Sequence, residues 1–240
     1  MSQPTPNSHQ QPDAAAAQVA GQSPSSSTPT AELASLKISL RAALRQFPDF
    51  PSPGILFEDI LPIFANPTLH EALLRSLELH ILQNHGDQKP DVIVGLEARG
   101  FLIGPSLALR LGASFVPVRK QGKLPGPCAT QAYEKEYGQD FFQMQADSIK
   151  PGQKVIVVDD IIATGVYILQ FISRQSPFPG ISNTDYIPTG GSAWAAGELI
   201  KKMGGELMSF LFILELEFLK GREKLPAPVY TLLSGQEEKH

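Results

Sequence analysis

Two adjacent acids followed by a turn of small residues are the groups in this chain best suited to chemistry. Asp159 and Asp160 end a β-branched run over 155–158, and Ala163-Thr164-Gly165 follows after two further residues. Carboxylates accept hydrogen bonds from sugar hydroxyls, and successive backbone N–H groups in a turn of small residues close around a phosphate. We infer a site for a phosphorylated sugar. A buried strand that merely ends in Asp before a glycine turn is the less specific alternative.

The surrounding pattern places these groups at the edge of a parallel sheet. The apolar run after Pro151-Gly152 predicts a fully buried strand, whose carboxyl end is where α/β sheets bind ligands. A second strand over 91–97 runs through Ala98-Arg99-Gly100 into a helix that reaches about Leu111. A guanidinium beside free N–H groups makes an anion site. An arginine exposed on an ordinary loop is the alternative.

The acid pair and its turn resemble the phosphoribosyl pyrophosphate (PRPP) motif of the type I phosphoribosyltransferases. The resemblance covers about residues 33–234 with one interruption, and it implies an α/β fold with a mainly parallel central sheet, flanking helices, a small hood and a β-hairpin flap. It implies that Asp159 and Asp160 hold the ribose hydroxyls. The 5′-phosphate is then expected on Ala163, Thr164, Gly165, Gly191 and Ser192.

Cationic residues of the chain fall on the family's pyrophosphate-binding positions. Ala98 and Arg99 correspond to the pyrophosphate loop, and Arg99 takes its basic position. Arg119, Lys120 and Lys123 correspond to a run that relatives use on PRPP, part of it across a dimer interface. Three cations on a strand end are usually a solvated face, but next to a ligand rich in phosphate we favour charge neutralisation.

A proline-rich stretch over 47–60 resembles the hood of adenine phosphoribosyltransferases. Without the resemblance it is an ordinary stiff connector. With it, the backbone of Leu56 is expected to bind adenine and the ring of Phe57 to stack on the purine. Glu58 stands where some relatives carry a basic residue and is assigned no role.

Alternating residues around Gly138-Gln139-Asp140 predict an antiparallel flap within residues 121–146. Such a lid excludes water from an activated ribosyl centre. The resemblance makes Glu136 the flap carboxylate that assists proton transfer at the purine, and places Tyr133 and Tyr137 over the ligands. Glu134 is the alternative to Glu136 on sequence alone.

The phosphate loop is interrupted by residues 166–190. Their sequence continues neither the pattern of the segment before them nor that of the segment after them. Their deletion joins Ala163-Thr164-Gly165 to Gly191-Ser192 and restores the family pattern. We favour a translated intron, because the codons can encode a GT donor at Gly165-Val166 and an AG acceptor at Thr189-Gly190. A genuine looped-out insertion is the alternative, since closing a long loop costs little. Separating the amides from the next helix would weaken phosphate binding.

Helical periodicity predicts two further helices before the first sheet strand. Leu33, Leu36, Leu40 and Leu44 recur at helical spacing, with Thr30 as the expected N-cap and an end near Phe47. A second helix begins at Asn66-Pro67 with Leu69, Leu73, Leu77 and Ile81 on one side. His70, His80 and His85 match no metal pattern, and we expect them to face solvent.

Composition limits the remaining choices. The net charge of −4 offers no footprint for nucleic acid, and no apolar run is long enough to span a bilayer. A single cysteine and the absence of a signal pattern favour the cytoplasm. Residues 1–30 are expected to be a disordered tail, and residues 31–240 one domain with its hood region at 31–62.

The motifs together predict an adenine phosphoribosyltransferase of purine salvage, which converts adenine and PRPP into AMP and pyrophosphate. The resemblance also implies a homodimer, and magnesium held mainly through substrate oxygens with no direct protein ligand. A non-catalytic PRPP or nucleotide sensor is the alternative that the damaged loop suggests. An enzyme for another purine base is a further one.

Overall fold

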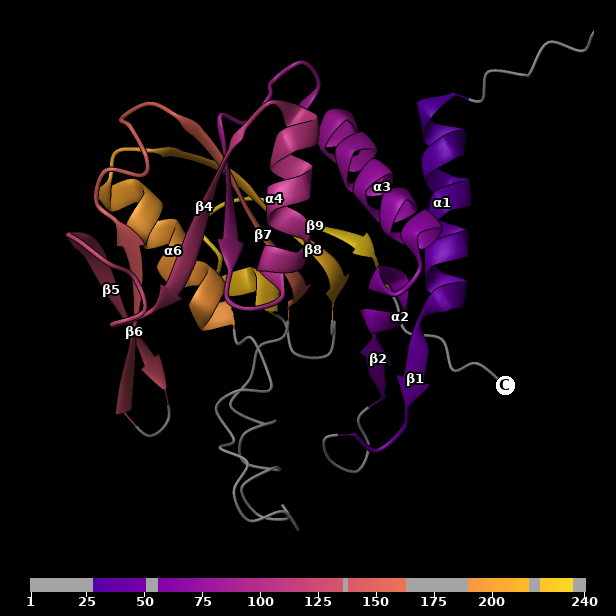
Figure 1. Cartoon of the computed structure of the whole chain (residues 1–240), viewed down its shortest axis with the longest axis horizontal. Coiled ribbons are helices and arrows are strands. Elements are labelled where there is room, and N and C mark those ends of the chain that lie inside the picture. Colours follow the sequence, from indigo (N-terminus) through magenta and orange to yellow (C-terminus); the bar gives the residue numbers. More distant parts are fainter. Residues whose placement is uncertain (1–27, 51–55, 136–137, 163–189, 216–220, 235–240) are drawn as a thin grey trace, which may run out of the picture.

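The computed structural model describes residues 28–50, 56–135, 138–162, 190–215 and 221–234. In these ranges a seven-stranded sheet of order β5-β6-β4-β3-β7-β8-β9 separates two layers of helices (Figure 1). Its strands are β3 (Val92–Leu96), β4 (Ser114–Lys120), β5 (Cys128–Lys135), β6 (Gly138–Gln145), β7 (Lys154–Ile162), β8 (Glu206–Glu215) and β9 (Val229–Leu233).

The central strands are parallel, and this arrangement brings the predicted site groups to one edge. Strand β3 pairs in parallel with β4 and with β7, and β8 pairs in parallel with β7 and β9. Strand β6 runs antiparallel to both β4 and β5. Because β3 and β7 are neighbours, the turn after β3 and the acids of β7 meet at the carboxyl edge. The predicted fold class is confirmed.

Helices cover both faces of the sheet. Helices α1, α3 and α4 lie on one side and α6 on the other (Figure 1). Side chains of β7 point alternately to the two faces of the sheet. Ile156 and Val158 pack in the core under α1, α3 and α4, whereas Val155 and Val157 pack in the core under α6. The helices are α1 (Pro29–Ala43), α2 (Leu61–Phe64), α3 (Pro67–His85), α4 (Gly100–Leu111), α6 (Gly190–Lys202) and the 3₁₀ helix η2 (Gly221–Lys224).

Helix α3 begins as the sequence predicts, and α1 does not. The Asn66 side chain accepts hydrogen bonds from the backbone N–H groups of Thr68 and Leu69 and so caps α3. In α1 the cap is Thr28, not Thr30, because Pro29 already occupies the first helical turn. Helix α1 also ends at Ala43 rather than near Phe47. The following residues are extended because they form a strand.

That strand, β1 (Arg45–Phe47), pairs antiparallel with β2 (Phe57–Asp59) to form a small separate sheet, which we call the hood. This name covers only the two strands; the predicted hood region 31–62 also includes α1, which packs in the helix layer, and its bounds stay a prediction. The guanidinium of Arg75 on α3 holds both carboxylate oxygens of Glu32 on α1, at 2.8 and 3.0 Å.

The expectation that three histidines face solvent is wrong for His80. Its side chain is 9% exposed, and its ring lies edge-on to Tyr230 of β9. His85 is half-buried and its Nε2 lies 2.8 Å from Ser209 Oγ. Helix α3 packs against the sheet edge through this region, so its inner face continues past Leu77. Burial lowers the pKa of His80 to about 4.

Across the described ranges, every helix is too short or too polar to cross a lipid bilayer.

Candidate active site

The two acids lie at the carboxyl end of β7 and are buried, Asp159 at 3% and Asp160 at 5% exposure. The backbone N–H of Asp160 donates to Asp159 Oδ1 at 2.9 Å. Asp160 Oδ2 meets Arg99 Nε at 2.6 Å, while Asp160 Oδ1 is buried with no hydrogen-bond partner among the described residues. A buried oxygen without a hydrogen-bond donor is energetically costly, so the site is suited to a ligand whose hydroxyl groups donate to it.

Burial also sets the charge state of the pair. Burial raises the pKa of Asp159 well above its usual range, and the neighbouring charge of Asp160 raises it further. Burial raises the pKa of Asp160 too, although the Arg99 guanidinium opposes the shift. A cation or a hydroxyl donor placed here would stabilise the ionised pair.

Arg99 reaches Asp160 because the turn after β3 packs tightly on β7. A Cβ atom on Gly100 would lie 2.6 Å from the carbonyl oxygen of Val158 and 3.4 Å from Asp159 Oδ1. Only glycine permits that approach. Helix α4 starts at this glycine, so its N-terminus, which favours anions, stands beside the acids. The peptide between Glu97 and Ala98 is cis.

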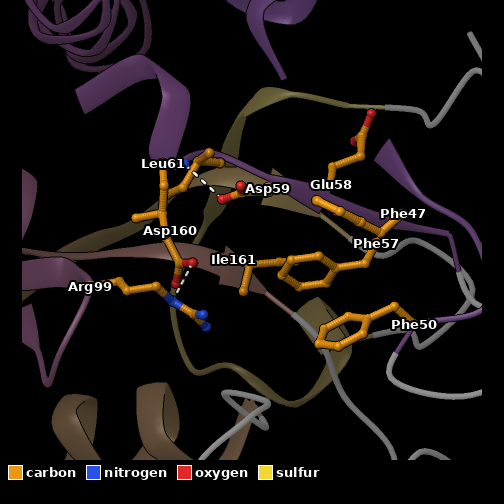
Figure 2. A pocket seen from close by; sticks show the side chains of 10 residues that line it. Phe47, Phe50, Phe57, Glu58, Asp59, Leu61, Arg99, Asp160 and Ile161 are labelled. Carbon is orange, nitrogen blue, oxygen red and sulfur yellow. Dashed lines mark hydrogen bonds and ion pairs between the residues drawn. The ribbon is translucent and has the colours of Figure 1, made fainter. Parts of the chain in front are cut away.

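A pocket of about 280 Å³ opens between this edge and the hood (Figure 2). Phe57 and Phe50 meet edge to face, with ring centroids 5.2 Å apart. The pocket therefore has an aromatic wall from the hood and a charged wall from the sheet. Its lining is Phe47, Phe50, Phe57, Glu58, Asp59, Ile60, Leu61, Arg99, Asp160 and Ile161.

The structure brings three predicted site residues into this lining, namely Phe57, Arg99 and Asp160. Leu56 is half-buried next to Phe57 but does not line the pocket. Sequence reasoning gave no role to Phe47 or Phe50. Their position in a loop with three prolines was the available signal, because aromatic residues in a stiffened loop are well placed to hold a flat ligand.

The predicted basic run has a partner that the sequence analysis missed. Arg119 Nη2 lies 2.6 Å from Glu97 Oε1, and Arg119 Nη1 donates to the Lys123 carbonyl at 3.1 Å. Arg119 lowers the pKa of Glu97. Lys123 is exposed and Lys120 half-buried. The charge on Arg119 is thus partly balanced within the chain, and the role of the run on PRPP stays a prediction.

The predicted flap is present as the antiparallel pair β5 and β6. The Tyr133 ring is buried and stacks on Phe142 at 5.0 Å, and its hydroxyl donates to Asp140 Oδ2 at 3.1 Å. Tyr133 therefore packs into the hydrophobic core that lies under α6, and its expected place over the ligands stays untested. Glu136 and Tyr137 lie outside the described residues, so their roles also remain predictions.

The phosphate loop is described only at its end. Helix α6 begins at Gly190 and carries Gly191 and Ser192 in its first turn, which matches the helix predicted after the interruption. Trp194, the single tryptophan of the chain, packs against the core in this turn. The other loop residues, Ala163-Thr164-Gly165, and nearly all of the interruption, 166–189, lie outside the described residues.

Known proteins are similar to this chain in both sequence and architecture. A phosphoribosyl transferase domain model matches residues 64–173. An adenine phosphoribosyltransferase of Yarrowia lipolytica is 56% identical over 205 residues, which are 85% of this chain and 99% of that protein. The Saccharomyces cerevisiae enzyme, solved with D-2,5-dideoxy-2,5-imino-altritol 1,6-bisphosphate and adenine, superposes with a TM-score of 0.70 at 51% identity, covering 83% of this chain and 99% of that one.

The fold, the acid pair and the matched domain define a type I phosphoribosyltransferase. Such proteins are pentosyltransferases. Relatives above 50% identity narrow the class, and the chain belongs to the adenine phosphoribosyltransferase family. A more distant member from Giardia lamblia, solved with 9-deazaadenine, still superposes with a TM-score of 0.64 at 27% identity, over 84% of this chain and 98% of that one.

Proposed function

We propose that this chain transfers the 5-phosphoribosyl group of PRPP to adenine, releasing AMP and pyrophosphate in purine salvage. The observation that carries the proposal is the pocket between the aromatic hood and the Arg99–Asp160 edge. It places a surface for a flat base opposite groups suited to a sugar and a pyrophosphate. The bond from the anomeric carbon to pyrophosphate oxygen breaks, a bond to a purine nitrogen forms, and that nitrogen loses its proton.

Each described site residue has a distinct task in this reaction. The rings of Phe57 and Phe50 hold the base, and the backbone of Leu56 is the proposed hydrogen-bonding partner of adenine. Asp159 and Asp160 accept hydrogen bonds from the ribose hydroxyls and stabilise positive charge that develops on the ribosyl ring. Arg99, already beside Asp160, neutralises the departing pyrophosphate.

The remaining predicted residues complete the proposal. Arg119, Lys120 and Lys123 would neutralise PRPP, with Ala98 in the pyrophosphate loop. Glu136 would assist proton transfer at the purine, and Tyr137 would help to cover the ligands. The 5′-phosphate would bind at Ala163, Thr164 and Gly165 together with Gly191 and Ser192, where the N-terminus of α6 favours an anion.

The donor set fits a magnesium ion that binds mainly through the substrate. In the described part of the chain, no group of three or more His, Cys, Asp or Glu side chains could hold a metal. Two carboxylates and a partnerless buried oxygen at Asp160 suit the ribose hydroxyls, so the ion would take most of its ligands from the substrate. Bound there, magnesium would neutralise charge between pyrophosphate and ribose. Asp159 and Asp160 would orient the ribose hydroxyls.

We also infer a cytoplasmic homodimer. The single cysteine suits a reducing compartment. Leu102 and Leu109, two turns apart on α4, are 41% and 83% exposed, which offers apolar surface for a second copy. Light scattering of the purified chain tests the dimer, and a monomer at micromolar concentration would contradict it.

The decisive experiment measures AMP formation from adenine and PRPP with magnesium. The full 240-residue chain is compared with a chain that lacks residues 166–190. The Asp160→Asn variant of each of these two chains is assayed beside them. We expect turnover in the shortened chain and its loss in Asp160→Asn. Turnover in the full chain as well would show that the phosphate loop forms around a genuine insertion. If neither folded chain makes AMP, the proposal fails and the sensor interpretation takes its place.

A further inference from the structure

Glu58 is a carboxylate that the proposed mechanism does not use, although it is 3% exposed and lies next to Phe57. Its carboxylate points away from the rings of Phe57 and Phe50 (Figure 2). Gln46, directly opposite in the β1–β2 pair, donates its Nε2 to Glu58 Oε1 at 3.1 Å. A buried acid with an amide partner still needs a positive charge nearby, because burial penalises the ionised form.

Arg41 on α1 supplies that charge and also contacts the end of the sheet. Its Nη1 lies 3.7 Å from Glu58 Oε1 and is buried without a hydrogen bond to any described residue. Its Nη2 donates to the carbonyl oxygen of Ser234, just beyond β9, at 2.6 Å. One guanidinium therefore joins the helix layer, the hood and the sheet, a task for which its planar fork is suited.

A second ion pair of the hood shows what this connection adds. Arg45 on β1 meets Asp59 on β2 at 2.5 Å, but the Arg45 side chain is 60% exposed. That pair stays inside the hood and is screened by water. The side chains of Arg41 and Glu58 are 24% and 2% exposed, so their attraction is screened less. Among these contacts, only Arg41 extends from the hood to the sheet.

We propose that Arg41 and Glu58 are positioning residues that hold the hood against the sheet and so fix Phe57 opposite Asp160 and Ile161. A hood that moved away from α1 would leave the Glu58 carboxylate without its cation. The place of β2 is thereby linked to α1 and β9. The consequence for base binding rests on the proposed function, whereas the mechanical link does not.

Hydrogen exchange on the unliganded full chain tests the link without requiring activity. Glu58→Gln keeps the shape and the amide contact but removes the charge, and Arg41→Met removes the cation. We expect backbone amides of β1 and β2 to exchange about tenfold faster in both, with Arg41→Lys in between. Arg75→Met is the matched control, because it breaks the other anchor of α1 and leaves the hood contacts intact. Unchanged exchange in Glu58→Gln would overturn the proposal, even if Arg41→Met fails to fold.

Ligand affinities test the consequence for the base. Titration calorimetry gives dissociation constants for AMP and for ribose 5-phosphate. The constant for ribose 5-phosphate divided by the constant for AMP isolates the contribution of adenine to binding. We expect the ratio to fall about tenfold in Glu58→Gln and to stay unchanged in Arg75→Met. Faster hood exchange with an unchanged ratio would overturn the role in base positioning. The affinities are measured in whichever chain forms AMP, the full chain or the one that lacks residues 166–190. If neither of these chains binds or forms AMP, the proposed function fails while hydrogen exchange still decides the link.

Discussion

The pocket has one wall from the sheet and one from the hood, and the two walls are built differently. The sheet wall carries Asp160 at the end of a nine-residue strand, between two hydrophobic cores. The hood wall is a pair of three-residue strands together with the residues that follow the first strand. Two of its aromatic rings are exposed, Phe47 at 44% in β1 and Phe50 at 39% after β1. Isolated two-stranded sheets are marginally stable, so the hood depends on its attachments in a way that β7 does not.

The comparison separates two tasks. In the proposed function, the sheet edge holds buried charged groups whose geometry must stay fixed during the reaction. In the same proposal, the smaller hood holds a flat base, for which stacking tolerates small shifts. Substitutions in the sheet wall should therefore reduce turnover, and substitutions in the hood should mainly weaken base binding.

Asp160→Asn is expected to have the largest effect. It removes a charge next to the ribosyl group but keeps the side-chain shape, and kcat/KM should fall about 10²- to 10³-fold. The melting temperature should not fall, because burial raises the pKa of this carboxyl and its ionised form is costly to bury. Steady-state kinetics and calorimetry on the active chain check both. A loss of activity that only parallels a loss of folded protein would argue against a catalytic role.

Gly100→Ala should disturb the sheet wall through packing alone. The added methyl group would lie 2.6 Å from the Val158 carbonyl oxygen, so α4 must move away from β7, at a cost of about 1–3 kcal/mol in unfolding free energy. Urea denaturation measures the loss. Gly112→Asn is the control, since that position is left-handed with open space around it and asparagine tolerates the conformation. Equal losses in the two variants would refute the packing argument.

Phe57→Ala should affect the hood wall and leave the sheet wall intact. Loss of one stacking ring is worth about 1–3 kcal/mol, so the KM for adenine should rise roughly tenfold or more while the KM for PRPP changes little. Initial-rate kinetics with each substrate varied in turn separates the two constants. A matched rise in both would mean that the hood and the sheet do not divide the substrates as proposed.

Lowering the pH should reduce the free energy of unfolding through the buried His80 of the helix layer. This is the smallest of the predicted effects. The folded-state pKa of His80 is about 4, below its value of 6.5 in the unfolded chain. Its contribution to stability is therefore complete above pH 6.5 and is lost as the pH falls from 6.5 towards 4. The loss should be about 1 kcal/mol at pH 5.5. Urea denaturation at pH 7.5 and 5.5 measures it, and His80→Leu should remove this part of the pH dependence. An unchanged dependence in the variant would assign the effect to other groups.

The sheet wall could be predicted from sequence because its signals are local. Strand β3 is a continuous apolar run that is followed by the turn with Arg99. Strand β7 contains an apolar run over 155–158 that leads directly into the two acids. Parallel pairing then brings these ends together. The residues of the hood were recognised mainly through family resemblance, because three-residue strands carry too little periodicity to be seen.

Charge pairing could not be predicted in the same way. The Arg41–Glu58 and Arg119–Glu97 pairs join residues on different elements, and nothing in the local pattern states which acid each cation meets. The burial of His80 is different, because its signal was present. His80 follows Leu77 by three residues and so lies on the same helical face as the buried leucines.

The continuity of the hood in sequence has an evolutionary consequence. Every hood residue that lines the pocket comes from the stretch between Phe47 and Leu61, whereas Arg99, Asp160 and Ile161 come from elsewhere in the chain. Under the proposed function, changes within one short run of codons would therefore alter the preferred base. Under the same proposal, the residues for the sugar and the pyrophosphate, Arg99 and Asp160 among them, would be inherited unchanged while the base preference changes.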